Sequence, residues 1–203
     1  MTPDLTAASA CYANLLRWTF EPQRLGYSLI TRDGEVVGGF GASPAGHPVG
    51  QWQVYLATKD VSASADRVKE LGGSIVAGPF PTGNTGRIVL AMDPLGASFG
   101  LWEGHRGEGV VLIDEPGVSC WHELRTPDLR AAGAFYGGLF PGRFDASALT
   151  PAVGPRAYTG WVPYFGTLDA PRLYDRAMSA GCAVQGALVT DPWGATFGVR
   201  QLD

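Results

Sequence analysis

The feature that most constrains this chain is a turn-and-strand segment that occurs twice. Residues 93–102 read Asp-Pro-Leu-Gly-Ala-Ser-Phe-Gly-Leu-Trp, and residues 191–200 read Asp-Pro-Trp-Gly-Ala-Thr-Phe-Gly-Val-Arg. Proline presets one backbone angle and the glycine after it accepts a positive φ, which is the chemistry of a tight turn. The alternating residues that follow predict a strand with one apolar face. Two copies in one chain predict a duplicated unit.

The duplication extends well beyond these two segments. Residues 2–5, Thr-Pro-Asp-Leu, recur at 126–129, and each copy opens a helix-like stretch with a tyrosine at the matching position, Tyr12 or Tyr136. A further set of residues recurs at constant spacing: Trp52, Tyr55, Thr58, Asp60, Asp66 and Arg67 match Trp161, Tyr164, Thr167, Asp169, Asp175 and Arg176. These matches predict two related halves.

On these residues the chain resembles the vicinal-oxygen-chelate superfamily, which includes glyoxalase I, bleomycin-resistance proteins and extradiol dioxygenases. More narrowly it is similar to the tandem two-domain bacterial members. The resemblance implies an α+β fold of tandem βαβββ modules, with curved, mainly antiparallel sheets and helices on their outer faces. It covers nearly the whole chain and says much less about function, because this fold hosts many chemistries.

The resemblance also divides the chain in order. We expect a first domain over 1–104 without the usual opening strand, a linker over 105–117, and a second domain over 118–203 with shortened hairpins. Hydrophobic spacing and end signals predict the helices, and they lie over 4–20, 62–71, 128–139 and 169–180. Residues 26–40 predict a hairpin with an Asp-Gly turn, whereas 141–158 contain no convincing hairpin.

Composition excludes several classes of protein. A net charge of −4 and no basic run argue against nucleic-acid binding. The chain has no apolar run long enough to span a bilayer and no signal-peptide pattern, so we expect a cytoplasmic protein without a membrane partner. Cys11, Cys120 and Cys182 are far apart in sequence and form no CxxC pair, which fits a reducing compartment and neither a disulfide framework nor a zinc site.

The resemblance implies a divalent metal held by His, Gln or Glu at fixed distances from the repeated motifs. Counting to those positions gives five residues, and they are Gln53, Gly100, Trp121, Val162 and Gly198. Only Gln53 has a side chain that can bind a metal, whereas a divalent ion generally needs three or more such protein groups. The sequence therefore predicts no metal site and no cofactor.

Strand alternation identifies the residues that face the concave side of each sheet. The expected ligand-binding residues on that side are Gln53, Tyr55, Ser98, Gly100, Trp102, Trp121, Tyr164 and Arg200. Glycines at the ligand positions are expected to leave room, and the aromatic rings offer flat apolar walls with polar edges. The alternative is that these aromatics pack between the two halves.

Glu123 and Arg125 lie two residues apart on one predicted strand and so share its concave face. The functional interpretation is a carboxyl group that shuttles a proton beside an arginine that holds an anionic group. The alternative is an inert, partly solvated ion pair. His122 falls on the opposite face, where Cys120 and Leu124 are expected to meet helices, and we expect it to be a core or edge histidine.

The hypothesis is a metal-independent protein that binds an aromatic or polycyclic small molecule in a curved-sheet cup, with acid–base chemistry of the isomerase, cyclase or lyase type on a secondary metabolite. One alternative is a drug-sequestering resistance protein without turnover. Another is a metal-dependent glyoxalase- or dioxygenase-like enzyme. The expected partners are a small-molecule ligand and a second copy of the chain, with no nucleic acid.

Overall fold

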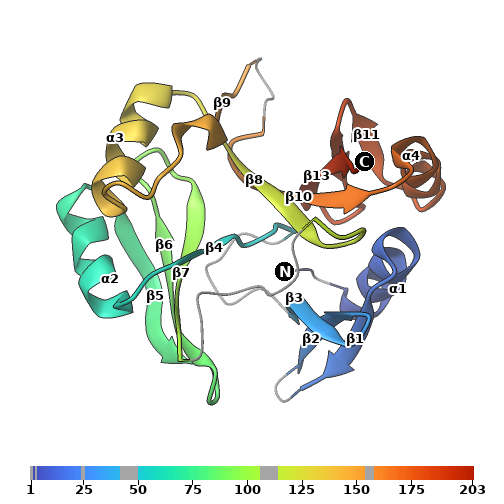
Figure 1. The fold of residues 1–203 in the computed structure, drawn as a ribbon, viewed down its shortest axis with the longest axis horizontal. Helices are drawn as coiled ribbons and strands as arrows, with labels where there is room; N and C mark the ends of the chain where they lie inside the picture. Colours follow the sequence, from blue (N-terminus) through green and yellow to red (C-terminus); the bar gives the residue numbers. More distant parts are fainter. Residues whose placement is uncertain (1, 3, 24–25, 42–49, 106–113, 154–157) are drawn as a thin grey trace. The chain divides into compact units, whose positions relative to one another are not determined.

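A computed structural model describes residues 2, 4–23, 26–41, 50–105, 114–153 and 158–203 (Figure 1). The chain is an α+β protein with mainly antiparallel sheets, as the sequence predicts. It forms two compact units. Unit 1 consists of Met1–Trp52, Val110–Trp121 and Pro163–Asp203, and unit 2 consists of Gln53–Gly109 and His122–Val162. Each unit therefore combines segments of both sequence halves and differs from the expected division into 1–104 and 118–203.

Unit 1 contains the first and last parts of the chain. Its N-terminal elements are α1 (Leu5–Leu16), β1 (Thr19–Pro22), β2 (Tyr27–Arg32) and β3 (Glu35–Gly41). Its C-terminal elements are α4 (Ala170–Ser179), β11 (Ala183–Gln185), β12 (Leu188–Thr190) and β13 (Thr196–Gln201). Helices α1 and α4 are in contact.

Unit 2 contains the middle of the chain. Its elements are β4 (Tyr55–Ala57), α2 (Val61–Glu70), β5 (Ser74–Pro81), β6 (Gly86–Met92), β7 (Ser98–Gly104), α3 (Leu129–Leu139), the 3-10 turn η2 (Ala146–Ala148) and β9 (Leu149–Pro151). Helices α2 and α3 are in contact. Two strands, β8 (Ser119–Thr126) and β10 (Gly160–Thr167), are each divided between the units.

The strand pairing repeats in the two halves. The order β4-β7-β6-β5 forms one sheet and β1-β2-β3 another, and the remaining strands follow the order β11-β12-β13-β10-β8-β9. Strand β4 pairs in parallel with β7, and β10 pairs in the same way with β13. Each pair joins the strand before a helix to the strand after an Asp-Pro turn, which is the repeat that the sequence predicts.

Most of the predicted elements are present, with differences at their ends. The helix expected over 4–20 ends at Leu16, because Arg17 takes a left-handed conformation at φ 57° and turns the chain into β1. The hairpin of β2 and β3 is confirmed. Between α3 and β10 the described residues form η2 and β9, which pairs with β8, and no hairpin.

The same N-terminal device begins all four of these α-helices. In each, a Thr-x-Asp segment precedes the helix, and the aspartate carboxylate accepts a hydrogen bond from a first-turn N–H at 2.9–3.0 Å. The aspartate's own N–H donates to the threonine hydroxyl at 3.2–3.4 Å. This capping satisfies N–H groups that have no partner inside the helix. The four pairs are Thr2 and Asp4, Thr58 and Asp60, Thr126 and Asp128, and Thr167 and Asp169.

The two Asp-Pro turns are organised by their aspartate side chains. Asp93 Oδ1 accepts hydrogen bonds from the N–H groups of Leu95 and Ala97, both at 2.9 Å. Asp191 Oδ1 accepts the equivalent bonds from Trp193 and Ala195, at 2.9 and 2.8 Å. The turn glycines have φ of 88° and 99°, as the sequence predicts for this type of turn. One carboxylate oxygen thus holds each turn closed.

The second oxygen of each aspartate binds a tyrosine from the other half of the sequence. Tyr12 of α1 donates to Asp191 Oδ2 at 2.8 Å in unit 1, and Tyr136 of α3 donates to Asp93 Oδ2 at 3.2 Å in unit 2. All four side chains are buried. Burial and the neighbouring carboxylate raise the pKa of both tyrosines, which keeps them protonated as donors.

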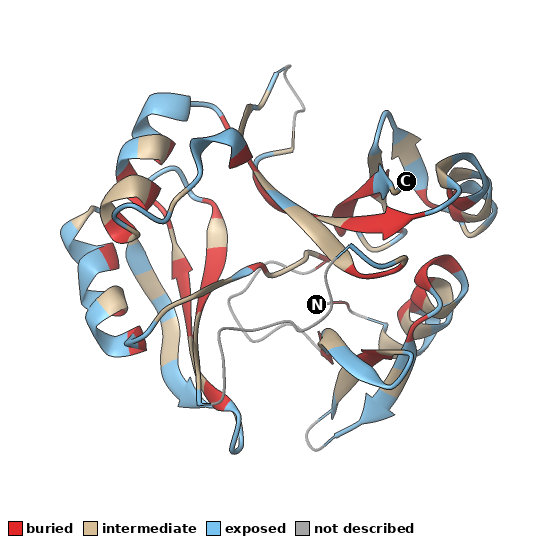
Figure 2. Cartoon of the chain, in the orientation of Figure 1, coloured by how far each residue is buried: buried red, intermediate tan, exposed pale blue. Residues whose placement is uncertain are grey.

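Trp52 and Trp161 take equivalent places in the two units. The indole of Trp52 lies 5.3 Å from the ring of Tyr12 at 85°, and that of Trp161 lies 5.3 Å from Tyr136 at 90°. Around each tyrosine the buried side chains of the paired helices and sheet form one hydrophobic core per unit, seen as the red segments in Figure 2. No helix in the described part of the chain is long and apolar enough to cross a membrane.

We predict that Tyr12→Phe and Tyr136→Phe each lower the free energy of unfolding by about 1–3 kcal/mol, because a buried aspartate oxygen loses its donor. Tyr174→Phe is the matched control. Tyr174 lies half-buried on α4 and makes no hydrogen bond to a described residue, so its loss should cost below about 0.5 kcal/mol. Urea denaturation measures all three. Equal small effects would show that the two tyrosine–aspartate bonds do not stabilise the fold.

Candidate functional site

The two faces of the strands are as the alternation predicts, with one exception. Val54, Phe99, Leu124 and Phe197 are buried in the cores, as expected for the faces that meet helices. His122 was expected on the same side as Leu124 but is exposed. The helix-covered position is therefore wrong for His122, and the edge position that was its alternative fits, because the core that covers Leu124 does not extend to its neighbour two residues earlier.

The expectation that Gly100 and Gly198 leave room for a ligand is also wrong. Tyr55 on β4 pairs with Gly100 on β7, and a Cβ at Gly100 would lie closer to the Tyr55 ring than two carbon atoms can approach. Tyr164 on β10 lies over Gly198 on β13 in the same way. Each glycine therefore accommodates the ring of the paired strand, so the two units carry the same aromatic-over-glycine arrangement.

Among the described residues, the side chains at the expected ligand positions do not fit the metal that the fold implies. Of the five positions where ligands are expected, only Gln53 offers a donor atom, and its Oε1 already accepts a hydrogen bond from Ser98 Oγ at 3.0 Å. Tyrosine rings cover the two glycine positions. Within the described ranges no cluster of three or more His, Cys, Asp or Glu side chains could hold a metal ion.

Unit 2 holds most of the predicted site residues. They are Gln53, Tyr55, Ser98, Gly100, Trp102, Glu123 and Arg125. Arg125 Nε donates to Glu123 Oε1 at 2.8 Å, and the two side chains are 27% and 14% exposed. The pair is thus shielded from solvent more than a typical surface ion pair, which strengthens its electrostatic interaction.

Gln53 is distinctive because its Nε2 is buried and has no hydrogen-bond partner among the described residues. A buried donor without a partner is unfavourable, so this N–H is available to an acceptor atom of a ligand. Because Gln53 lies against Ser98 at the edge of the Tyr55 and Gly100 pair, its amide is a polar contact available at this face.

Unit 1 holds the other three predicted residues, Trp121, Tyr164 and Arg200. Trp121 is half-buried on β8, and Arg200 is exposed near the end of β13. The Cys120 thiol donates to the backbone oxygen of Tyr164 at 3.4 Å, which ties β8 to β10 beside Trp121. The predicted residues therefore form two sets, one in each unit.

The fold brings together two cysteines that are far apart in sequence. Cys11 of α1 and Cys182 after α4 lie close enough for each thiol to influence the pKa of the other. Burial raises the pKa of both thiols, and the adjacent Cys11 contributes to raising the pKa of Cys182 to about 12. Both thiols are therefore protonated near neutral pH, which makes them poor nucleophiles.

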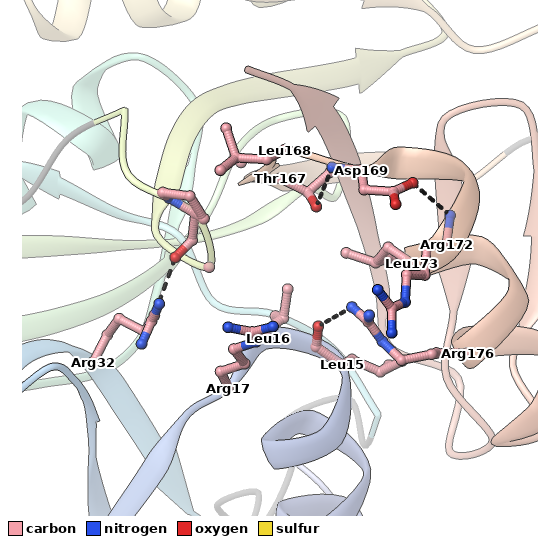
Figure 3. A pocket seen from close by; sticks show the side chains of 13 residues that line it. Leu15, Leu16, Arg17, Arg32, Thr167, Leu168, Asp169, Arg172, Leu173 and Arg176 are labelled. Atoms are coloured by element: carbon pink, nitrogen blue, oxygen red, sulfur yellow. Dashed lines mark hydrogen bonds between the residues drawn. The ribbon is translucent and has the colours of Figure 1, made fainter. Parts of the chain in front are cut away.

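The cavity found in unit 1 lies where the sequence predicted no site. It has a volume of about 250 Å³ and lies where the end of α1, the end of β10 and the start of α4 meet residues 116–117 (Figure 3). Four arginines line it, and they are Arg17, Arg32, Arg172 and Arg176. The one sequence signal for it is the spacing of Arg172 and Arg176, which places both on one side of α4.

Comparison with known proteins finds a matching family and relatives that align with nearly the whole chain. The sequence profile of the glyoxalase/bleomycin resistance protein/dioxygenase superfamily matches residues 1–101. "Putative glyoxylase CFP32" of Mycobacterium tuberculosis is 31% identical, covering 98% of this chain and 90% of its own. "Anthracycline biosynthesis protein DauV" of Streptomyces sp. strain C5 is 29% identical, covering 99% and 90%.

A solved structure shares the fold across the whole chain. The Mn(II)-bound glyoxalase from Novosphingobium aromaticivorans has a TM-score of 0.62 and 15% identity, covering 100% of this chain and 80% of that one. At this identity the likeness concerns the fold alone.

We predict that Gly100→Ala lowers the free energy of unfolding by about 1–3 kcal/mol, because the added methyl group displaces the Tyr55 ring. In a Tyr55→Ala background the same change should cost much less. Gly137→Ala is the control, since a methyl group added at Gly137 within α3 would have no neighbouring atom within 4 Å and should gain about 0.5–1 kcal/mol. An equal cost of Gly100→Ala with and without Tyr55 would contradict the aromatic-over-glycine contact.

Proposed function

The chain belongs to the glyoxalase/bleomycin resistance protein/dioxygenase superfamily, and from this premise we propose that it binds an aromatic or polycyclic small molecule of secondary metabolism and transforms it without a metal ion. The observation that carries the proposal is the shielded pair of Glu123 and Arg125 on the face of β8. Glu123 acts as the acid–base group, and Arg125 orients it and attracts an anionic group of the ligand.

Aromatic residues predicted for the concave faces of the sheets support a ligand of this class. Trp121 lies two residues before Glu123 on the same strand, and alternation gives both the same face. Tyr55 is exposed over Gly100, and Trp102 is half-buried on the same strand as Gly100. Burial of a flat ring against such side chains stabilises a complex by about 25 cal/mol per Å² of apolar area.

Gln53 supplies the polar contact that the proposal needs. Its buried Nε2 lacks a partner among the described residues, so a carbonyl or hydroxyl oxygen of a ligand can satisfy it. A ligand that lacks such an oxygen leaves this donor unpaired. The site thereby selects an oxygenated aromatic compound over a hydrocarbon of the same shape.

The chemistry that fits a single carboxylate is proton transfer next to a carbonyl group. The carboxylate removes a proton from one carbon, the electron pair of the broken C–H bond passes into an enolate, and the same carboxyl group returns the proton to another atom. This isomerisation is balanced without a further reactant. A well-placed general base contributes roughly 10²–10⁴ in rate.

The relatives support the class of ligand. DauV is named for anthracycline biosynthesis, which supports a role in secondary metabolism for this chain. The proposal includes a cytoplasmic location, supported by three cysteines that are all free.

Two other functions make different predictions. A drug-sequestering protein would bind the same kind of ligand without product, and the Mn(II)-bound glyoxalase represents the metal-dependent alternative. Of the five candidate ligand positions, only Gln53 carries a side chain that can bind a metal ion. The proposal therefore expects neither a bound metal ion nor a loss of activity when a chelator is added. Elemental analysis of the purified protein tests this, because about one metal ion per chain would support the metal-dependent enzyme.

We predict that Trp121→Ala weakens binding of an oxygenated planar compound such as a hydroxynaphthoquinone by about tenfold or more, because a large aromatic contact is lost. Glu123→Gln should leave the dissociation constant nearly unchanged and lower turnover by roughly 10²-fold or more. Intrinsic tryptophan fluorescence measures binding, and product analysis measures turnover with a panel of such compounds.

Two variants serve as controls. Trp193→Ala removes an indole from the Asp191 turn, and Glu70→Gln removes an exposed carboxylate from α2. Both should retain wild-type binding and turnover. Unchanged binding in Trp121→Ala would contradict the ligand site, whereas binding without product in the wild type would support the sequestering protein instead.

A further inference from the structure

The cavity in unit 1 combines a strong positive charge with an apolar wall. Four arginine side chains and one carboxylate, that of Asp169, line it (Figure 3). Leu15, Leu16, Leu168 and Leu173 line it as well. Leu168 is 64% exposed, so part of the apolar wall is open to solvent. A volume of about 250 Å³ holds more than a simple ion.

The carboxylates near the cavity do not neutralise its arginines completely. Asp169 Oδ1 accepts the backbone N–H of Arg172 at the start of α4. Asp33 pairs with Arg32 at 2.8 Å, but its side chain is 76% exposed and it does not line the cavity. Within the described part of the chain, Arg17, Arg172 and Arg176 form no salt bridge. The lining therefore keeps an excess of positive charge.

Arg176 is only partly satisfied by the protein. One terminal nitrogen donates to the backbone oxygen of Leu15 at 3.2 Å, which caps the end of α1. Its Nε is buried and has no partner among the described residues. A guanidinium group has five N–H donors in a planar fork, so this single carbonyl contact leaves most of its binding capacity unused.

The repeat provides an internal comparison. Arg67 of α2 is the counterpart of Arg176, and its Nε donates to the backbone oxygen of Gly138 at 3.2 Å. Arg67 also pairs with Glu70 at 2.9 Å, whereas the counterpart of Glu70 in α4 is Ser179. The counterpart of Arg172 is Ala63. In unit 2, one arginine that is paired with a glutamate is thus enough to bind the end of the helix. The unpaired arginines of unit 1 are not needed for that contact and call for another explanation.

We propose that this cavity binds the phosphate group of a small organic molecule. The arginine forks of Arg172 and Arg176 suit the oxygens of a dianion. Further charge comes from Arg17, which follows α1, and from Arg32 at the end of β2. The leucines contact the organic part of the ligand. The cavity shares no residue with the proposed aromatic-ligand site. A phosphate oxygen bound here accepts a hydrogen bond from the buried Nε of Arg176.

Isothermal titration calorimetry of the full chain tests this in a buffer free of phosphate, at fixed ionic strength. The probes are phenyl phosphate, inorganic phosphate and benzoate. Phenyl phosphate should bind in a one-to-one ratio, more tightly than inorganic phosphate because of the leucines, and more tightly than benzoate because of its second charge. Arg172→Gln and Arg176→Gln should each weaken phenyl phosphate binding by about tenfold or more.

Arg67→Gln is the matched control, because it alters the same helix-capping contact in unit 2 and should leave phenyl phosphate affinity unchanged. Arg172 is exposed, so its variant should fold normally even if Arg176→Gln does not. No saturable heat with phenyl phosphate, equal weakening by Arg67→Gln, or benzoate binding as tightly as phenyl phosphate would each overturn the proposal.

Discussion

The hydrogen bond between a buried tyrosine and the aspartate of an Asp-Pro turn is the interaction on which both units depend. Each aspartate uses one oxygen to close its own turn and the other to bind a tyrosine from a helix of the opposite sequence half. A buried carboxylate is costly unless its oxygens are paired. Helix and turn must therefore meet. This requirement brings α1 to the Asp191 turn and α3 to the Asp93 turn.

The rest of each unit follows from this contact. The closed turn sets the register of the strand after it, and that strand pairs in parallel with the strand before the helix. In this register a tyrosine lies over a glycine in both units, at a position where the fold implies a metal ligand. At these two positions the backbone framework thus carries a tyrosine ring over a glycine. This difference explains why the fold gives little information about the chemistry.

The sequence predicts most of the fold because its signals are local and repeated. The Thr-x-Asp caps, the Asp-Pro-x-Gly turns and the strand alternation each determine a short segment, and the structure has all of them. The units could not be predicted, since the Tyr12 and Asp191 contact joins residues 179 apart. The tyrosine-over-glycine contacts depend on strand register, which alternation alone does not supply.

The site was predicted less completely than the fold. Alternation placed Glu123 and Arg125 on one face, and the structure pairs them. It gave no indication of the arginine cavity, because Arg17, Arg32 and Arg176 come together only when α1 meets α4. Alternation could not decide between a core and an edge position for His122, because it says which side a residue faces and not where the covering core ends.

A double-mutant cycle tests the central interaction most directly. The cycle combines Tyr12→Phe with Asp191→Asn, and a second cycle combines Tyr12→Phe with Asp93→Asn, with unfolding free energy as the readout. The account predicts a coupling energy of about 1–3 kcal/mol in the first cycle and additivity within about 0.5 kcal/mol in the second. Additivity in the first cycle, or comparable coupling in both, would contradict it.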